Sequence, residues 1–179
     1  MKALEIFKTS KRLNKPIIFI IAPMLGMVGQ ATVAFHLQNA LSDKYLPVVV
    51  GYCSPKIQKT NFNGFVIELP WGSDIKSVRI FFYLFRILYL SIYGIILKPK
   101  FVIAQGDTGI FLGIILKFLI RGCICIGSYH LTLLNDNKNN YKKKLIKKLD
   151  GIHFVSFGMM EQYKKKFVLP KSFIIYNPS

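Results

Sequence analysis

Strand-like and helix-like segments alternate along the whole chain, and this alternation limits the fold more than any other feature. Residues 17–21 form an uninterrupted run of isoleucine and phenylalanine, typical of a strand buried on both faces of a parallel sheet. A helical pattern with apolar residues on one face follows over residues 30–41. Right-handed crossovers join parallel strands in such an arrangement. The sequence therefore predicts an α/β fold, a Rossmann-like doubly wound parallel sheet of about seven strands with helices on both faces.

Seven segments have the apolar, β-branched character of strands. They cover residues 17–21, 46–52, 64–69, 101–104, 123–128, 152–156 and 173–176. At 179 residues the chain is long enough for one domain with a proper core and too short for two domains of ordinary size. We therefore expect a single domain over residues 1–179.

Two of the helical stretches are unusually apolar. Over residues 79–98, Arg79, Arg86 and Tyr93 recur every seven residues and form a narrow polar stripe on an otherwise apolar cylinder. Arg86 near the middle, and the strand that follows, argue against a membrane span. We expect this helix to lie between the sheet and either a membrane surface or a partner. Residues 110–120 are short enough for an ordinary core helix.

The chain is strongly basic, with 25 Lys and Arg against 8 Asp and Glu and a net charge of +17. Such a charge favours an anionic partner, either a membrane surface or a nucleic acid, although lysines also serve simply as solvated residues. Residues 141–149 predict a short basic amphipathic helix suited to anionic lipid headgroups, or a solvated face. A nucleic acid is not expected, because the lysines lack interleaved stacking aromatics. The lysines of this segment are Lys142, Lys143, Lys144, Lys147 and Lys148.

The cysteines and the first residues indicate the compartment. Residues 1–15 are mixed and basic and do not resemble a signal peptide. The three cysteines are an odd number, which favours reduced thiols and a cytoplasmic protein. Cys123 and Cys125 alternate with isoleucine, so we interpret them as small strand residues and assign no metal.

A glycine loop lies between the first strand and the first predicted helix. Gly26 and Gly29 are not part of a Walker A sequence or of a three-glycine dinucleotide pattern. They would let the backbone approach a ligand, and the helix N-terminus that follows favours a phosphate. Two spaced glycines are also common in a simple turn.

Five segments taken in order resemble the family-4-type GT-B glycosyltransferases, and together they cover residues 15–179. The first is the strand, glycine loop and helix up to Leu41, in which Gly29 falls on a family glycine. The others are KFVIAQGD (100–107), IGSYH (126–130), LDGIHFVS (149–156) and IIYNP (174–178). The last of them is similar to the hinge between the two halves of these enzymes.

The resemblance implies the N-terminal, acceptor-binding half of a retaining, metal-independent glycosyltransferase, with the C-terminal donor-binding domain absent. It implies no cofactor; a nucleotide-sugar is the co-substrate, and the acceptor is a glycan or a lipid-linked molecule at the cytoplasmic face of the membrane. Gly26 and Gly29 would form the loop at the donor diphosphate, and His130 would lie at the cleft edge near the transferred sugar. Gln105 and Asp107 would lie on the acceptor side.

Two other functions remain open. The chain could be a non-catalytic subunit that recruits a separate donor-binding chain to the membrane, or an inactive truncated remnant. Individual residues also have structural interpretations. His130 could merely close a loop, we expect His36 and His153 to be structural, and Ser156 would cap the helix after the sixth strand or act in the site.

Overall fold

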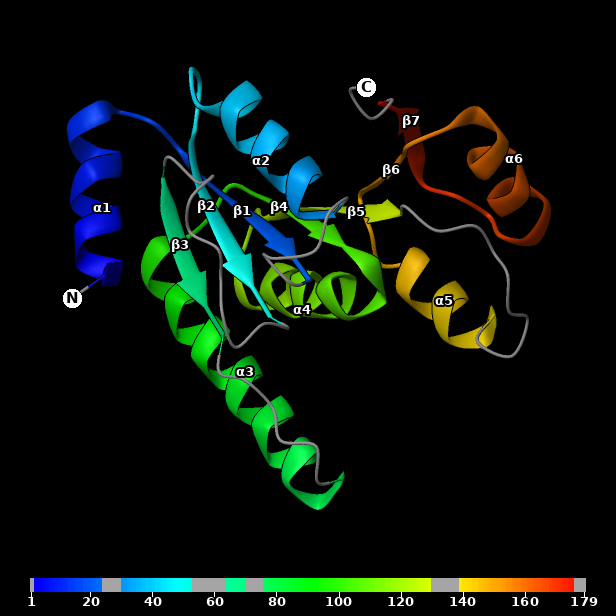
Figure 1. Ribbon diagram of the computed structural model, residues 1–179, viewed down its shortest axis with the longest axis horizontal. Coiled ribbons are helices and arrows are strands. Elements are labelled where there is room, and N and C mark those ends of the chain that lie inside the picture. The colour runs from blue at the N-terminus through cyan, green and yellow to red at the C-terminus, as the bar shows by residue number, and fades with distance from the viewer. Residues whose placement is uncertain (1, 24–29, 53–63, 70–75, 130–138, 176–179) are drawn as a thin grey trace.

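The computed structural model describes residues 2–23, 30–52, 64–69, 76–129 and 139–175 (Figure 1). Seven strands in this part of the chain form one sheet in which every pairing is parallel. The strand order is β3-β2-β1-β4-β5-β6-β7, so the predicted Rossmann-like parallel sheet is confirmed. The strands are β1 (Ile17–Ala22), β2 (Leu46–Gly51), β3 (Phe65–Glu68), β4 (Phe101–Gln105), β5 (Ile124–Tyr129), β6 (Gly151–Phe154) and β7 (Lys171–Ile174).

The central position of β1 follows from its composition. All six of its residues are buried, because β2 and β4 pair with its two sides and side chains pack on both faces. The chain runs outward from β1 to β3, then returns to the other side of β1 and continues outward from β4 to β7. The direction of winding therefore changes between β1 and β4, which is the topological switch point of the sheet.

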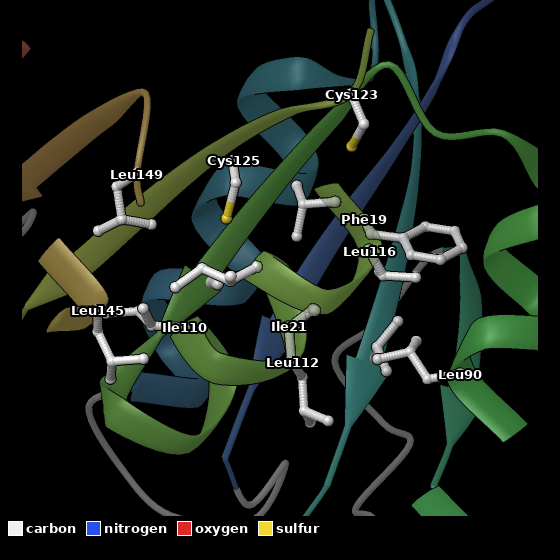
Figure 2. Close-up of a cluster of buried hydrophobic side chains, with 14 of the residues drawn as sticks. Phe19, Ile21, Leu90, Ile110, Leu112, Leu116, Cys123, Cys125, Leu145 and Leu149 are labelled. Carbon is white, nitrogen blue, oxygen red and sulfur yellow. The ribbon is translucent and has the colours of Figure 1, made fainter. Parts of the chain in front are cut away.

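The helices divide unequally between the two faces. Buried residues of α2 pack with those of β1 and β2 in the smaller of two core clusters. The other five helices contribute to the larger cluster, part of which is shown in Figure 2. The helices are α1 (Lys2–Leu13), α2 (Gln30–Leu41), α3 (Lys76–Leu97), α4 (Gly106–Leu119), α5 (Asn139–Ile146) and α6 (Phe157–Lys166).

Two elements at the ends of the chain differ from the sequence-based expectation. Helix α1 was not predicted, because Ile6 is its one fully buried side chain and the rest of the segment is mixed and basic. Strand β7 begins at Lys171 rather than at Phe173, since Lys171 pairs with Gly151 of β6. Lys171 is exposed at this outermost strand, so the first residues of β7 lack the apolar pattern of a buried strand.

Helix α3 is as apolar as expected, and two residues of the predicted polar stripe, Arg86 and Tyr93, face the protein. Arg86 is 9% exposed and lies over the ring of Tyr83. Tyr93 is half-buried, and its hydroxyl lies 3.3 Å from that of Tyr89. This side of α3 packs against α1 and α4. No helix in the described ranges combines the length and the apolar character that crossing a membrane requires.

The core helix α4 and the two cysteines beside it agree with the sequence-based interpretation. Ile110, Leu112 and Leu116 of α4 are buried against the sheet, and Figure 2 shows the thiols of Cys123 and Cys125 in the same cluster. Burial raises the pKa of Cys123 to about 11 and that of Cys125 to about 12. Both thiols therefore stay protonated at neutral pH and act as small apolar groups. Cys53 lies outside the described residues.

Candidate functional site

The candidate site lies where β1, β4 and β5 end, at the carboxyl edge of the sheet. Open α/β sheets bind their ligands outside this edge, at the switch point between two neighbouring strands. Here that point lies between β1 and β4. Three of the predicted site residues, Gly26, Gly29 and His130, follow the ends of β1 and β5 and lie outside the described residues. Their roles stay predictions.

The junction of β4 and α4 brings two predicted acceptor-side residues to this edge. Strand β4 ends at Gln105 and α4 begins at the next residue, Gly106, with no loop between them. Gly106 has a φ of +67°, a left-handed conformation that glycine adopts without the strain other residues suffer. This sharp turn places Asp107 in the first turn of α4, where the helix dipole favours a negative charge.

Gln105 is completely buried, and its backbone carbonyl oxygen accepts a hydrogen bond of 3.0 Å from the hydroxyl of Tyr52. Neither atom of its side-chain amide has a hydrogen-bond partner among the described residues. A buried amide without partners is costly, so groups of this kind commonly mark a place where a ligand or a further segment of chain binds.

Asp107 interacts electrostatically with three tyrosines that come from different elements. Burial raises the pKa of Tyr129 and of Tyr163, and the negative charge of Asp107 raises both further. Burial, Tyr83 and Asp107 in turn raise the pKa of Tyr141. All three phenols are therefore neutral at physiological pH and remain potential hydrogen-bond donors.

Several polar atoms of this cluster are buried without a described partner. The Tyr163 hydroxyl is one. The Tyr129 hydroxyl and the Oδ1 atom of Asp107 are two others, although a hydrogen bond with Asp107 is among the causes that raise the pKa of Tyr129, so these two side chains lie close to each other. The rings of Tyr129 and Tyr163 pack 4.9 Å apart, and that of Tyr163 lies 5.2 Å from Phe154. The aromatic packing fixes the tyrosine rings, so their hydroxyls are held in place before a ligand binds.

Helix α3 closes the cluster on a further side. The hydroxyl of Tyr83 lies 3.3 Å from the Oγ1 atom of Thr108, which is next to Asp107 in α4. Arg86, one turn further along α3, has its guanidinium group 6.0 Å from the centre of the Tyr83 ring. The first half of α3 is thereby connected to the candidate site.

The arrangement is suited to binding a molecule with many hydroxyl groups. A carboxylate accepts hydrogen bonds, and neutral phenols donate and accept them, so together they match the alternating donors and acceptors of a sugar. Charge-assisted hydrogen bonds to a carboxylate are about twice as strong as neutral ones. In the described part of the chain, no group of three metal-binding side chains comes together.

The lysines predicted to meet a membrane lie on α5 and in the residues that follow it. Lys143, Lys144, Lys147 and Lys148 are exposed and Lys142 is partly so. The apolar side of the same segment, with Leu145, Ile146 and Leu149, is buried in the larger core. Tyr141 is exposed, but the segment offers no continuous apolar face to a lipid surface, and its contact with a membrane stays a prediction.

Ser156 and His153, for which the sequence suggested structural roles, have surroundings that fit those roles. Ser156 is the N-cap of α6, and its side chain accepts a hydrogen bond from the backbone N–H of Met159. His153 is buried in β6, where it contacts the Ser128 hydroxyl and the carbonyl oxygen of Ile175. His36 is exposed on α2, with its ring 5.7 Å from that of Phe35.

The tyrosine cluster was not found from the sequence. The sequence indicates a site position only for Tyr52 and Tyr129, because each lies at the carboxyl end of a predicted parallel strand. Tyr83, Tyr141 and Tyr163 lie on three separate helices and are far apart in the sequence. Only the packing of these helices against the sheet brings them to Asp107.

The sheet and its ligand-facing edge define the class of the domain: a Rossmann-like α/β domain with polar groups gathered at the carboxyl edge of the sheet. The solved structures similar to this chain include GT-B glycosyltransferases. A sucrose-phosphate synthase chain from Thermosynechococcus elongatus has a TM-score of 0.64 at 11% identity, over 91% of this chain and 90% of that one. HepE of Anabaena, solved with UDP and glucose, has a TM-score of 0.66 at 12% identity, over 92% and 45%.

A third similar structure is the lipopolysaccharide outer core galactosyltransferase WaaB in its apo form. Its TM-score is 0.66 at 17% identity, over 91% of this chain and 46% of that one. At such identities the similarity establishes the fold. The chain spans a little under half the length of HepE and of WaaB. No family model matches the sequence, and no curated protein matches it significantly.

Proposed function

We propose that the chain is the acceptor-binding half of a retaining glycosyltransferase. In this proposal a donor-binding half, supplied by another domain or chain, holds the nucleotide-sugar. The sugar is transferred to a glycan or a lipid-linked acceptor at the cytoplasmic face of the membrane. Asp107 and the tyrosines around it bind acceptor hydroxyls, His130 lies beside the transferred sugar, and the loop with Gly26 and Gly29 approaches the donor diphosphate.

One observation carries this proposal. The Asp107 carboxylate has a buried oxygen without a described hydrogen-bond partner, interacts electrostatically with three neutral phenols, and follows β4 at the edge where this fold binds ligands. The fold is that of glycosyltransferases, one of which was solved with UDP and glucose. A polyhydroxylated acceptor would supply the hydrogen bonds that the cluster lacks.

The proposal is tested by saturation-transfer NMR on the purified chain with a panel of free monosaccharides: glucose, galactose, mannose and N-acetylglucosamine. At least one sugar is expected to bind. Asp107→Asn should weaken its binding about tenfold, because a hydrogen bond to a charged group contributes about 1.5–3 kcal/mol. Asparagine keeps the shape of the side chain but loses the charge.

The matched control is Glu161→Gln, which removes one carboxylate from an exposed ion pair with Lys164 on α6. This variant should bind the sugar as the original chain does. Failure of every sugar in the panel to bind at millimolar concentration would contradict the proposal. Equal binding by the Asp107→Asn and control variants would remove Asp107 from the acceptor site.

A second function is favoured by the exposed apolar side of α3. The chain could be a non-catalytic subunit that recruits a donor-binding chain to a membrane. Co-purification of a second Rossmann-like chain, together with no effect of Asp107→Asn on the activity of the pair, would favour this function over the first.

A further inference from the structure

The outward side of α3 carries a continuous row of large apolar side chains. They recur at intervals of three and four residues, so they share one face of the helix. Each is between 45% and 66% exposed. The row extends for about 22 Å along the helix at 1.5 Å per residue. We call this row the apolar face of α3; it consists of Phe81, Leu84, Phe85, Leu88, Ile92, Ile95 and Ile96.

The exposed apolar surface continues from α3 onto the end of α4, which packs beside it. Phe118 is 70% exposed and Leu119 is 49% exposed. The Nζ atom of Lys148 lies 5.2 Å from the centre of the Phe118 ring. A contiguous apolar surface of this kind on a folded chain marks a site of interaction.

A pocket of about 450 Å³ lies between the ends of α3 and α4. Ile95 and Leu119 form apolar parts of its lining, and Lys98, Lys100 and Arg121 supply three cations. Its lining includes no carboxylate, and none of these three cations is paired with one among the described residues. The pocket is at the amino edge of the sheet, opposite the candidate functional site, because Lys100 and Arg121 precede β4 and β5.

The presence of three cations at this pocket is only partly explained by the dipoles of α3 and α4, which end beside it. A helix C-terminus favours a nearby cation, which accounts for Lys98 after α3 and Arg121 after α4. Lys98, however, has a φ of 46°, a left-handed conformation that is strained for any residue other than glycine. The dipoles do not explain Lys100, whose Nζ atom lies 5.8 Å from the centre of the Phe101 ring, or why three cations line one pocket together with apolar side chains.

We propose that the apolar face of α3 and the end of α4 dock on an anionic phospholipid membrane, and that the cationic pocket holds a lipid phosphate. The apolar side chains would enter the acyl region at the interface, while the three cations bind the headgroup layer. This inference deepens the membrane part of the proposed function. It locates the contact on α3 and α4, away from α5, and does not depend on sugar transfer.

Charge favours a lipid over a second copy of the chain. The pocket lining contains no acidic residue, so a second copy would offer no partner there to Lys98, Lys100 and Arg121. The net charge of +17 also opposes the association of two copies. An anionic membrane complements the cations and the apolar row at once.

The same face leads to the candidate functional site. Tyr83 lies in α3 between three residues of the apolar face, Phe81, Leu84 and Phe85. Its hydroxyl contacts Thr108, which is next to Asp107. In Figure 1 the first turns of α3 extend past the ends of β2 and β3. A membrane bound along α3 would therefore lie beside the site that binds the acceptor.

Binding to vesicles tests the proposal directly. The probe is sedimentation with vesicles of phosphatidylcholine alone and of phosphatidylcholine with one quarter phosphatidylglycerol. The chain is expected to bind the anionic vesicles at least tenfold more tightly. Replacing Lys98, Lys100 and Arg121 by glutamine should weaken this binding at least tenfold, and Leu88→Ser with Ile92→Ser should do the same.

Matched variants distinguish binding at the cationic pocket from a general effect of the positive net charge. The triple change of Lys164, Lys165 and Lys166 to glutamine removes the same charge from α6 and should weaken binding less than threefold. Equal losses of vesicle binding in the two triple variants would contradict the role of the pocket as the lipid-phosphate site. A larger loss on replacing the three α5 lysines Lys142, Lys143 and Lys144 by glutamine would move the contact to α5 and overturn the proposal as well.

Two further measurements test other occupants. Inorganic phosphate at constant ionic strength should not displace the chain from vesicles, and displacement at submillimolar phosphate would indicate a site for a soluble anion instead. Sedimentation velocity should give the same monomeric species for the original chain and for the Leu88→Ser, Ile92→Ser variant. A dimer that this variant dissociates would show that the face joins two copies.

Discussion

His153 is a buried titratable group with a defined tautomer. The carbonyl oxygen of Ile175 can only accept a hydrogen bond, so the Nε2 atom of His153 carries the proton, at a distance of 3.1 Å. The Nδ1 atom then accepts from the Ser128 hydroxyl at 2.8 Å. The ring also stacks on Phe173. These contacts connect three neighbouring strands, β5, β6 and β7, near their carboxyl ends.

This arrangement predicts a loss of stability in mild acid. Burial lowers the pKa of His153, and the hydrogen bond to Ile175 opposes this effect only in part. Below about pH 6.5 the unfolded chain therefore binds a proton more readily than the folded chain does. The free energy of unfolding should be insensitive to this group above pH 6.5. It should fall below that pH by at most about 1.4 kcal/mol per pH unit.

Urea unfolding between pH 5 and pH 8 measures this dependence. The control is His153→Gln, which retains polar side-chain atoms but does not titrate. The variant should be less stable at pH 7 and should lose most of the slope between pH 6.5 and pH 5. An unchanged slope in the variant would assign the acid sensitivity to other groups.

At the scale of elements, Gly113 explains how closely α4 approaches the sheet. A Cβ atom at this position would lie 2.9 Å from the Sγ atom of Cys125, 3.0 Å from the Cβ of Ala104 and 3.2 Å from the Cγ1 of Val102. These contacts are too short to be accepted without a shift of the helix or of the strands. Glycine is therefore required in the middle of α4, where its low helix propensity would otherwise be a disadvantage.

A pair of glycine substitutions tests this packing. Gly113→Ala should lower the free energy of unfolding, because overpacking costs about 1–3 kcal/mol and outweighs the gain in helix propensity of about 1 kcal/mol. Gly158→Ala in α6 is the matched control, since nothing lies within 4 Å of its Cβ position. It should leave stability unchanged or raise it by up to about 1 kcal/mol. Urea unfolding of both variants gives the comparison, and a stabilised Gly113→Ala variant would contradict the close packing of α4.

At the scale of the whole molecule, opposite edges of the sheet carry the two proposed sites. The Asp107 cluster lies at the carboxyl edge and the cationic pocket at the amino edge, with α3 running between them. A strand of six residues such as β1 spans about 20 Å. The apolar face of α3 has a similar length, so a membrane could contact it from one edge to the other.

This arrangement predicts that a lipid-linked acceptor binds better than the free sugar. A glycolipid that carries a sugar bound by the chain, presented in vesicles with one quarter phosphatidylglycerol, should bind at least tenfold more tightly than the free sugar. The reason is that docking raises the local concentration of acceptor beside Asp107. Surface plasmon resonance on immobilised vesicles measures the first affinity, and NMR titration measures the second.

The control for this prediction is the double variant Phe81→Ser, Phe85→Ser. Both side chains are exposed on the apolar face of α3, at 66% and 45%. The variant should lose most of the preference for the glycolipid and should bind the free sugar as before. Equal affinities of the original chain for the two forms of acceptor would separate membrane docking from acceptor binding.

The fold class and the order of its elements could be predicted from the sequence because both depend on local properties. Apolar runs such as residues 17–21 have the length and branching of buried strands, and helical periodicity lies between them. Parallel strands with intervening helices leave few ways of winding a sheet. The same reasoning placed Gln105 and Asp107 at the carboxyl edge, since they follow a strand.

The tertiary structure alone decided which faces meet. The repeat of Arg86 and Tyr93 defines one side of α3 but does not say whether that side faces the protein, because periodicity carries no direction. Contact with α1 and α4 turned this side inward and left the apolar row exposed. In the same way, Tyr141 and Tyr163 reach Asp107 through helix packing, which depends on contacts between residues far apart in the chain.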